Sequence, residues 1–415
     1  MRQNCRKPFI FPAMYGIILL FGSKANEKGR EQIMRISDSI VYVGVFDKDL
    51  DLFEGQYAVP MGVSYNSYVI LDDKTAVMDS VDSRKTAEWL ANVEAALNGK
   101  APDYLVVQHL EPDHSGSIQA IADKYPDMKL VMTAKALTML PQFADASLAA
   151  RAQGVKENET LNLGSHTLKF ITAPMVHWPE VMLTYEESEK VLFSADAFGT
   201  FGDPEKDAWL PEARRYYFNI VGKYGGPVAT LLKKAGTLDI QTILPLHGPA
   251  LKENLGFYLD KYRVWSSYAP EEKGTLVAFG SLHGNTAGAA KLLADELKAL
   301  GETVSVIDLA RDDMALAVAE AFRFDKLVLA CSTYDGGFFP KMEDFLLHLK
   351  AKAFQKRRAA LIENGSWAPM AAKGMKAYLE QMKDMALCET VVTIKSTVSE
   401  ANKEQLKALA KELLA

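Results

Sequence analysis

The sequence predicts two α/β domains in one chain: a sandwich of two sheets with helices outside it, and then a doubly wound parallel sheet. In the first part, histidine and carboxylate residues recur directly after short apolar strands, as they would at one edge of such a sandwich. A short polar stretch with a proline, residues 268–273, marks a boundary. Beyond it, strand and helix patterns alternate strictly, which is typical of a parallel sheet. The chain has 415 residues, 48% of them hydrophobic, which is enough for two or three cores.

Charge and cysteine content exclude several classes of protein. The formal net charge is −6, and no run of Lys and Arg interleaved with aromatic residues is present, which argues against nucleic-acid binding. Three cysteines, Cys5, Cys331 and Cys388, form neither a disulfide framework nor a Cys-x-x-Cys pair. Iron or zinc bound by thiolates is therefore not expected, and a reducing cytoplasm fits best.

The first 33 residues differ from the rest of the chain. Residues 1–7 are basic and residues 9–22 are almost wholly apolar, which is the outline of a secretory signal and too short to span a membrane comfortably. A polar stretch follows, and Met34 opens the first strand pattern. We expect residues 1–33 to be an extension outside the fold, with a cleaved signal peptide as the alternative.

The first domain, residues 34–268, is expected to alternate strands with helices. The pattern at 65–71 and 75–78, with the polar turn 72–74 between them, predicts a hairpin. Asp82 or Ser83 is expected to cap a helix that Gly99 ends. The remaining expected strands are 35–45, 104–107, 129–132, 167–172, 181–185, 191–194 and 242–244, and the remaining expected helices are 118–125, 134–143 and a long one at 212–232.

The stretch Gln108-His109-Leu110-Glu111-Pro112-Asp113-His114 packs two imidazoles and two carboxylates behind the strand 104–107. Groups this close would repel one another, or stay buried and unpaired, unless a cation or hydrogen bonds neutralised them. The alternative is a solvated turn in which Asp113 caps a helix opening at Ser115. Mixed imidazole and carboxylate ligands suit Fe or Mn better than hydrolytic zinc, so the stretch predicts such a metal.

This pattern, His-x-Glu-x-Asp-His, resembles the di-iron branch of the metallo-β-lactamase superfamily, the flavodiiron proteins. Three later residues resemble further ligands of that family: His177 in Val-His-Trp-Pro, Asp196 in Ser-Ala-Asp-Ala-Phe-Gly, and His247 in Pro-Leu-His-Gly-Pro. His166, His283 and His348 lie outside this metal pattern.

The resemblance implies a ligand assignment. His109, Glu111 and His177 would hold one iron, Asp113 and His247 the other, and Asp196 would bridge the two. His114 either joins the ligands or turns away, since members of the family differ at this position. Tyr216 or Tyr217 could offer a hydroxyl to the substrate, with aromatic helix packing as the alternative for both.

The second domain, residues 273–415, predicts a ligand site at the carboxyl ends of its strands. Its expected strands are 275–279, 303–307, 326–330, 359–362 and 389–394, and its expected helices are 286–300, 314–322, 341–352, 370–382 and 400–414. The loop 280–286 offers hydroxyls, a glycine and a helix N-terminus, which suit a phosphate. The loops 331–340 and 363–369 place Tyr334 and Trp367 beside glycines, where they could stack on a flavin ring.

Together the three loops resemble flavodoxin and the flavodoxin-like half of flavodiiron proteins. The alternatives are that the first loop is a turn that binds no ligand and that Trp367 packs in the core. The residues expected to contact FMN are Ser281, Leu282, His283, Gly284, Asn285, Thr286, Ser332, Thr333, Tyr334, Asp335, Gly336, Gly337, Asn364, Gly365, Ser366 and Trp367.

The resemblance covers nearly all of residues 34–415. It implies a metallo-β-lactamase-like αββα sandwich followed by a flavodoxin-like doubly wound sheet, and an oxidoreductase that reduces O2 to water or NO to N2O at two irons. FMN would pass on the electrons of an external donor, a rubredoxin or a flavin reductase, in a head-to-tail homodimer or a dimer of dimers. A zinc hydrolase fused to a flavodoxin and a pure electron carrier with an idle metal domain are the alternatives.

Overall fold

The computed structural model describes residues 34–202 and 209–415. The predictions for residues 1–33, including Cys5, and for part of the polar loop before residue 209 lie outside the described residues.

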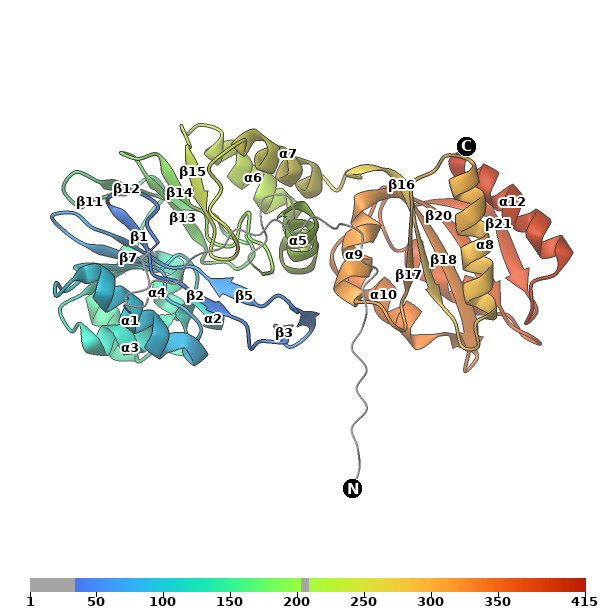
Figure 1. The fold of residues 1–415 in the computed structure, drawn as a ribbon, viewed down its shortest axis with the longest axis horizontal. Helices are drawn as coiled ribbons and strands as arrows, with labels where there is room; N and C mark the ends of the chain where they lie inside the picture. Colours follow the sequence, from blue (N-terminus) through green and yellow to red (C-terminus); the bar gives the residue numbers. More distant parts are fainter. Residues whose placement is uncertain (1–33, 203–208) are drawn as a thin grey trace, which may run out of the picture. The chain divides into compact units, whose positions relative to one another are not determined.

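The first domain is a sandwich of two sheets (Figure 1). The first sheet has the strand order β1-β6-β7-β8-β9-β10 and the second has the order β11-β12-β13-β14-β15. Two small pairs, β2 with β5 and β3 with β4, lie beside them. The strands are β1 (Ile40–Tyr42), β2 (Val45–Asp47), β3 (Leu52–Phe53), β4 (Tyr57–Ala58), β5 (Val63–Tyr65), β6 (Tyr68–Ile70), β7 (Ala76–Met78), β8 (Tyr104–Val106), β9 (Lys129–Thr133), β10 (Ala152–Val155), β11 (Thr160–Asn162), β12 (Thr167–Thr172), β13 (Met182–Glu186), β14 (Val191–Phe193) and β15 (Thr242–Leu244).

Both faces of each sheet contribute side chains to a buried core, because side chains alternate between the faces along a strand. Tyr68 and Ile70 join a core that also holds Phe170 and Phe193 of the second sheet, so this core lies between the sheets. Val69, which points to the opposite face, belongs to a larger core that includes the helices. The helices are α1 (Thr86–Leu97), α2 (Pro112–Ser115), α3 (Ile118–Lys124), α4 (Ala134–Met139), α5 (Trp209–Tyr216), α6 (Gly225–Ala235) and α7 (Leu255–Ser266). The predicted αββα sandwich is confirmed.

The long helix expected at 212–232 is wrong, because the chain breaks it into several pieces. Helix α5 passes into a π-helix, Tyr217–Val221, and a 3-10 turn, Gly222–Tyr224, before α6 begins. Glycine is a poor helix former, and Gly225 approaches the end of α7 so closely that a Cβ on it would lie 2.3 Å from the Ser266 carbonyl oxygen. Apolar periodicity alone did not reveal this close approach.

The expected strand 65–71 is also wrong, because it divides into β5 and β6 at Asn66. Tyr65 pairs with β2, whereas Tyr68 pairs with both β1 and β7. Between them, Asn66 Nδ2 donates to the carbonyl oxygens of Pro245 and Gly248, each at 2.8 Å. The break therefore ties the first sheet to the loop that follows β15. The predicted hairpin of β6 with β7 is confirmed.

The second domain is a parallel sheet with helices on both faces (Figure 1). Its strand order, β17-β16-β18-β20-β21, is the flavodoxin-like one. The strands are β16 (Glu272–Gly280), β17 (Val304–Asp308), β18 (Phe324–Tyr334), β20 (Arg358–Asn364) and β21 (Ala386–Ile394), with the short β19 (Gly337–Phe338) antiparallel to the end of β18. The helices are α8 (Asn285–Ala299), α9 (Met314–Arg323), α10 (Pro340–Ala351), α11 (Ala371–Leu379) and α12 (Glu400–Leu414).

Alternating residues of this sheet divide between its two faces. Val277 and Phe279 of β16 pack with α8 and α12, and Leu276 and Ala278 belong to the core on the other face, with residues of α9, α10 and α11. The doubly wound prediction is confirmed, although β16 begins inside the polar stretch that the sequence analysis placed at the boundary.

The π-helix of the first domain packs against α9 of the second. The rings of Phe218 and Phe322 stack with their centroids 4.2 Å apart, and Asn219 Nδ2 donates to the Ala315 carbonyl oxygen at 3.0 Å. An ion pair between Arg215 and Asp313, at 3.2 Å, lies beside them.

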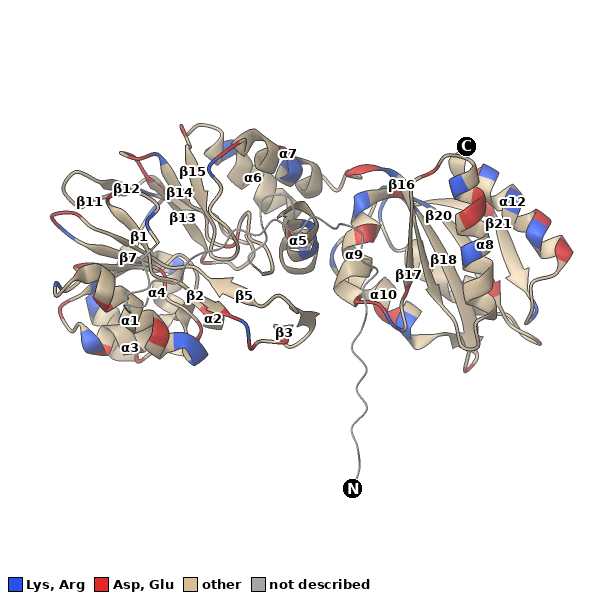
Figure 2. Cartoon of the chain, in the orientation of Figure 1, with Lys and Arg blue, Asp and Glu red and all other residues tan. Residues whose placement is uncertain are grey.

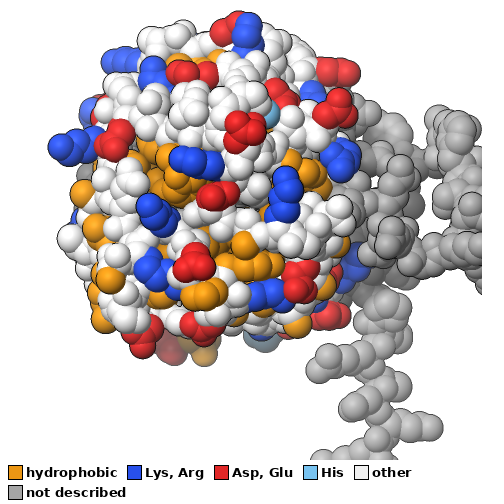
Figure 3. All heavy atoms as spheres, turned by 90° about the vertical axis from the view of Figure 1, so that its left-hand side faces the viewer, with side chains coloured by type: hydrophobic (Ala, Val, Ile, Leu, Met, Phe, Trp, Pro, Cys, Tyr) orange, Lys and Arg blue, Asp and Glu red, His pale blue; other side chains and the backbone are white. Residues whose placement is uncertain are grey.

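Acidic and basic side chains are interspersed over the described chain (Figure 2). On the face of the first domain in Figure 3, apolar areas lie between charges of both signs, with no large basic patch. None of the helices in residues 34–202 and 209–415 is long and apolar enough to cross a membrane.

His166 connects three turns at one end of the sandwich. Its Nδ1 lies 2.9 Å from Asp72 Oδ2 in the β6–β7 turn, and its Nε2 lies 3.2 Å from Glu189 Oε1 in the β13–β14 turn. Burial alone would lower the pKa of His166, but the hydrogen bonds to the two carboxylates outweigh it and raise this pKa. The stabilisation is thus complete at low pH and is lost as the pH rises through the raised pKa.

We predict that His166→Gln lowers the free energy of unfolding by about 1–2 kcal/mol at about pH 6 and by clearly less at about pH 9. Urea unfolding of both proteins at the two pH values measures the difference. An equal loss at both values would show that the charge on the imidazole contributes nothing.

Candidate metal centre and flavin pocket

Seven predicted ligand side chains converge at one edge of the sandwich. They form two adjoining groups: His109, Glu111, His177 and Asp196 in one, and Asp113, His114 and His247 in the other. Within each group, one ligand atom from every residue lies within 4.8 Å of the others. We call these seven residues the metal centre. The loops after β8, β12, β14 and β15 bring them together from positions far apart in the sequence.

Asp196 lies between the two groups. Its Oδ2 is 3.0 Å from His177 Nε2 and 3.3 Å from His109 Nε2, whereas its Oδ1 is 3.3 Å from His114 Nε2 and 3.6 Å from His247 Nε2. The carboxylate thus directs one oxygen at each group, which is the arrangement that a bridging ligand requires.

The backbone around Asp196 is held in an unusual conformation. Ala195 and Phe198 both have positive φ, at 48° and 69°, in a region that non-glycine residues rarely adopt. The Phe198 N–H donates to the Tyr262 hydroxyl at 2.5 Å, which fixes this tight turn from α7.

Asp113 does not cap a helix, so the alternative for the stretch 108–114 is wrong. It lies inside the short helix α2, is 8% exposed, and neither of its carboxylate oxygens has a hydrogen-bond partner. Its Oδ2 instead lies 3.2 Å from His247 Nε2 and 3.3 Å from His114 Nε2. A buried carboxylate without donors is costly unless a cation neutralises it.

His114 points into the metal centre in this structure. Its Nε2 lies 3.1 Å from that of His247, so two ring nitrogens face the same small space. Its Nδ1 has no hydrogen-bond partner. Two imidazole nitrogens at this distance suit a shared metal, so of the two orientations expected for His114 the structure shows the one that faces the ligands.

Glu180 is a buried partner of the centre that the sequence analysis missed. Its Oε1 lies 2.8 Å from His109 Nδ1 and accepts from the Leu110 N–H at 3.0 Å. A carboxylate on the outer nitrogen of a ligand imidazole fixes the ring and its tautomer. In the sequence, Glu180 directly follows His177-Trp178-Pro179, and this position next to a predicted ligand could have identified it.

The other supports of the ligands are polar groups of neighbouring loops. His247 Nδ1 donates to the Ser64 carbonyl oxygen at 2.7 Å. Asp79 accepts from the Gln108 N–H at 2.7 Å and from Gln108 Nε2 at 2.8 Å, which shapes the start of the ligand loop. Complete burial raises the pKa of Asp79 to about 6, even though these hydrogen bonds oppose the shift.

Ionic interactions between the ligands bear on metal binding. Burial alone would lower the pKa of His177, but hydrogen bonds to Asp196 and Glu111 raise it to about 9. Burial would raise the pKa of Glu111, but hydrogen bonds with His109 and His177 lower it. A metal must therefore displace protons from imidazoles that the carboxylates have made basic, so metal binding should weaken as the pH falls.

The two predicted tyrosines differ in their surroundings. The Tyr216 ring lies 5.6 Å from that of His247, and burial raises the pKa of Tyr216 well above its ordinary value. Tyr217 instead packs against Tyr262 and Trp265, and its buried hydroxyl has no hydrogen-bond partner.

The predicted cofactor loops of the second domain surround a pocket of about 480 Å³, which we call the flavin pocket. Its lining contains the predicted residues except Gly284 and Gly337. Gly284 is instead the residue before α8, with a φ of 91°, and Gly337 belongs to β19. Trp367 is 91% exposed, which excludes its packing in the core.

The lining also includes Ser396, which was not predicted. Asn364 Nδ2 donates to the Ser396 carbonyl oxygen at 2.9 Å, and the Ser396 N–H donates back to Asn364 Oδ1 at 3.0 Å. Ser396 lies in the loop that follows β21, and β21 is the neighbour of β20 in the sheet. This place after a neighbouring strand could have identified Ser396 as a lining residue.

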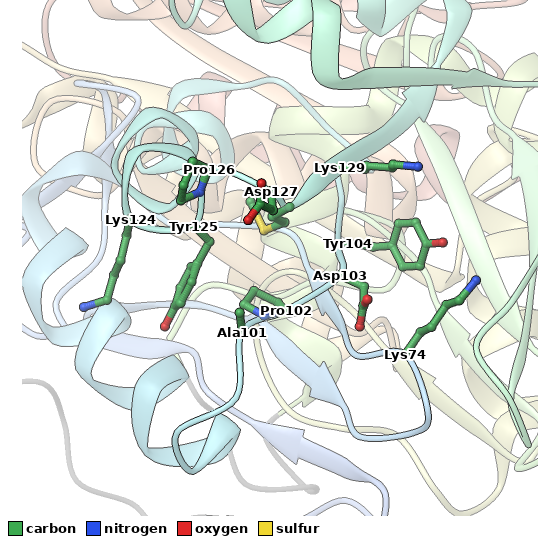
Figure 4. Close-up of a pocket in the computed structure, with 11 residues that line it drawn as sticks. Lys74, Ala101, Pro102, Asp103, Tyr104, Lys124, Tyr125, Pro126, Asp127 and Lys129 are labelled. Carbon is green, nitrogen blue, oxygen red and sulfur yellow. The ribbon is translucent and has the colours of Figure 1, made fainter.

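A further hollow, of about 500 Å³, lies at the opposite ends of β8 and β9 (Figure 4). None of the predicted site residues lines it. Its charged groups are of both signs and partly paired, since Asp103 accepts from the Thr75 N–H and Lys124 pairs with Glu94. We assign it no function.

Comparison with known proteins covers both domains. Residues 63–248 match the model of the ODP family of beta-lactamases, and residues 277–407 match that of flavodoxin. The chain is 28% identical over 398 residues to rubredoxin-oxygen oxidoreductase of Megalodesulfovibrio gigas, covering 92% of this chain and 97% of that protein. It is 27% identical over 383 residues to anaerobic nitric oxide reductase flavorubredoxin of Vibrio vulnificus, covering 88% and 75%. The crystal structure of the flavodiiron protein from Giardia intestinalis superposes with a TM-score of 0.87 at 25% identity, covering 94% of this chain and 98% of that one.

We predict that Glu180→Gln weakens iron binding ten- to a hundredfold, since the His109 ring loses its carboxylate partner. Iron per subunit after dialysis against graded chelator measures this. Glu186→Gln is the control, because Glu186 is equally buried but accepts from the Ser188 and Glu189 N–H groups, away from the metal centre. Equal iron retention in the two variants would contradict the role of Glu180.

Proposed function

Because this chain belongs to the flavodiiron proteins, we propose that it reduces O2 to water, NO to N2O, or both, at a pair of non-haem irons held by the metal centre. The observation that carries this proposal is the Asp196 carboxylate, which directs one oxygen at each group of ligands. Flavodiiron proteins are oxidoreductases whose cofactors are FMN and a di-iron centre.

The side chains of the metal centre fit iron. They combine four imidazoles with three carboxylates and no thiolate, a set that suits iron better than structural zinc. Buried oxygens of Asp113 and Asp196 have no hydrogen-bond donor, which a cation would explain. His109, Glu111 and His177 would hold one iron, Asp113, His114 and His247 the other, and Asp196 both. Paired irons would supply one electron each and a joint binding site for a small diatomic molecule.

The flavin pocket fits FMN. The first turn of α8 has no side-chain cap, whereas Ser399 caps α12 in the same domain, so the N–H groups at the start of α8 are free for a phosphate. Tyr334 and Trp367 lie in the lining with exposed rings that could stack on the flavin. FMN would accept electrons from the donor and pass them on.

Protons must reach the substrate as well as electrons, and Tyr216 is placed to help. Its hydroxyl keeps its proton, because burial raises the pKa, and its ring lies beside His247. We propose that the Tyr216 hydroxyl donates a hydrogen bond to the substrate oxygen. Tyr217 has no such role, since it packs among aromatic rings away from the ligands.

The electron donor and the assembly are further parts of the proposal. The names of two relatives refer to rubredoxin, and we propose a rubredoxin or a flavin reductase as the external donor. We also propose a head-to-tail dimer, in which the FMN of one subunit serves the irons of its partner. Exposed apolar side chains around the flavin pocket, Leu282, Tyr334 and Trp367, support a partner surface there.

We predict that Asp196→Ala lowers the rates of both O2 and NO consumption by about a hundredfold or more, while the protein keeps its FMN. The test uses purified, iron-loaded, reduced protein and an electrode for each gas. Asp239→Ala, which removes an exposed carboxylate, is the control and should retain the rates. Unchanged gas consumption by Asp196→Ala would contradict the proposal. A purified protein that holds zinc in place of iron would instead favour a zinc hydrolase fused to a flavodoxin.

A second test compares the two adjacent tyrosines. We predict that Tyr216→Phe lowers the rate of gas reduction by about ten- to a hundredfold, because the substrate loses a hydrogen-bond donor. Tyr217→Phe should keep the rate within about twofold, since it only removes an unpaired buried hydroxyl. Equal rates for both variants would contradict the role of Tyr216.

A further inference from the structure

The flavin pocket is lined by polar and aromatic side chains but by neither lysine nor arginine among its described residues. His283, in the loop between β16 and α8, is the lining side chain that can carry a positive charge. The other ionisable side chains of the lining are Tyr334 and Asp335, which are neutral or negative. A phosphate in this pocket would therefore find its side-chain cation at one position.

His283 lies next to the place where a phosphate would bind. It directly precedes Gly284, the residue before α8, whose φ of 91° turns the chain into the helix. The Gly284 N–H donates to Ser281 Oγ at 3.1 Å, which closes the loop around the free N–H groups of α8. The first turn of α8 carries neither acidic nor basic residues, and its first lysine, Lys291, does not line the pocket.

We propose that protonated His283 pairs with the FMN phosphate and makes the affinity for this cofactor depend on pH. The role of His283 rests on the proposed function, since it requires that the pocket hold FMN. As a side-chain type, histidine changes charge between about pH 5 and 8. The N-terminus of α8 attracts the phosphate whether or not His283 is charged.

The sign of the pH effect follows from two titrations. A phosphate monoester loses its second proton at about pH 6, so its attraction to the N-terminus of α8 grows as the pH rises. The attraction between the phosphate and an imidazole weakens as the pH rises, because only a protonated imidazole pairs with an anion. The informative quantity is therefore the ratio of the FMN dissociation constants of a neutral variant and the natural protein, because the titration of the phosphate is common to both.

The test measures release of FMN from the purified holoprotein by serial dilution, with the fluorescence of free flavin as the readout. For His283→Gln we expect a dissociation constant about three- to tenfold above that of the natural protein at about pH 5.5, and an equal one at about pH 8.5. His283→Lys, which keeps its charge, should bind as tightly as the natural protein at low pH and more tightly than it at high pH. His348→Gln, which changes a histidine of α10 outside the lining, should not change the ratio at either pH.

A ratio for His283→Gln that stays constant between the two pH values, whatever its size, would overturn the proposal. His283 is exposed, so the variant should fold, and near-identical circular dichroism spectra of the proteins check this. This test distinguishes the role of His283 from the proposed function. A protein that is purified without FMN would contradict the proposed function. Bound FMN with a constant ratio would contradict only the role of His283.

Discussion

The structure of the first domain depends on the convergence of imidazoles and carboxylates around Asp196. Four histidines and three acids from separate loops face a common space inside a protein interior, where unpaired charges are costly. Their mutual ion pairs offset part of that cost, but oxygens of Asp113 and Asp196 remain without donors. A pair of cations would remove the remaining conflict, so in the proposed account the metal is part of the folded state of this edge of the sandwich.

Hydrogen bonds from distant segments hold the loops that carry the ligands. Asn66 connects the break between β5 and β6 to the loop of His247, and Glu180 holds both the His109 ring and the Leu110 amide. Tyr262 holds the turn of Asp196 from a helix on the outside of the sandwich. Each support is a hydrogen bond between segments far apart in the sequence, so ligand geometry depends on the tertiary fold and not on any one loop.

Much of this could be predicted from the sequence, and the failures have physical causes. The ligand pattern around His109 and the loops around Tyr334 and Trp367 are local, and they carry the resemblance to the family. The alternation of strands and helices from β16 to α12 could be predicted because the central strands are continuous apolar runs, buried on both faces, and each helix has one apolar face. By contrast, the close approach of Gly225 to Ser266, where α6 begins after the irregular turns, and the hydrogen bonds of the Asn66 amide, where β5 and β6 separate, are contacts between distant segments. The support from Glu180 and the lining by Ser396 also needed three-dimensional neighbours that apolar periodicity does not report.

The most direct test of the central claim is X-ray diffraction from crystals of the purified protein at wavelengths on either side of the iron absorption edge. The account predicts two iron peaks, one on each side of the Asp196 carboxylate, the first beside His109 and His177 and the second beside Asp113 and His247. A single peak, an iron peak elsewhere, or a signal only at the zinc edge would contradict it.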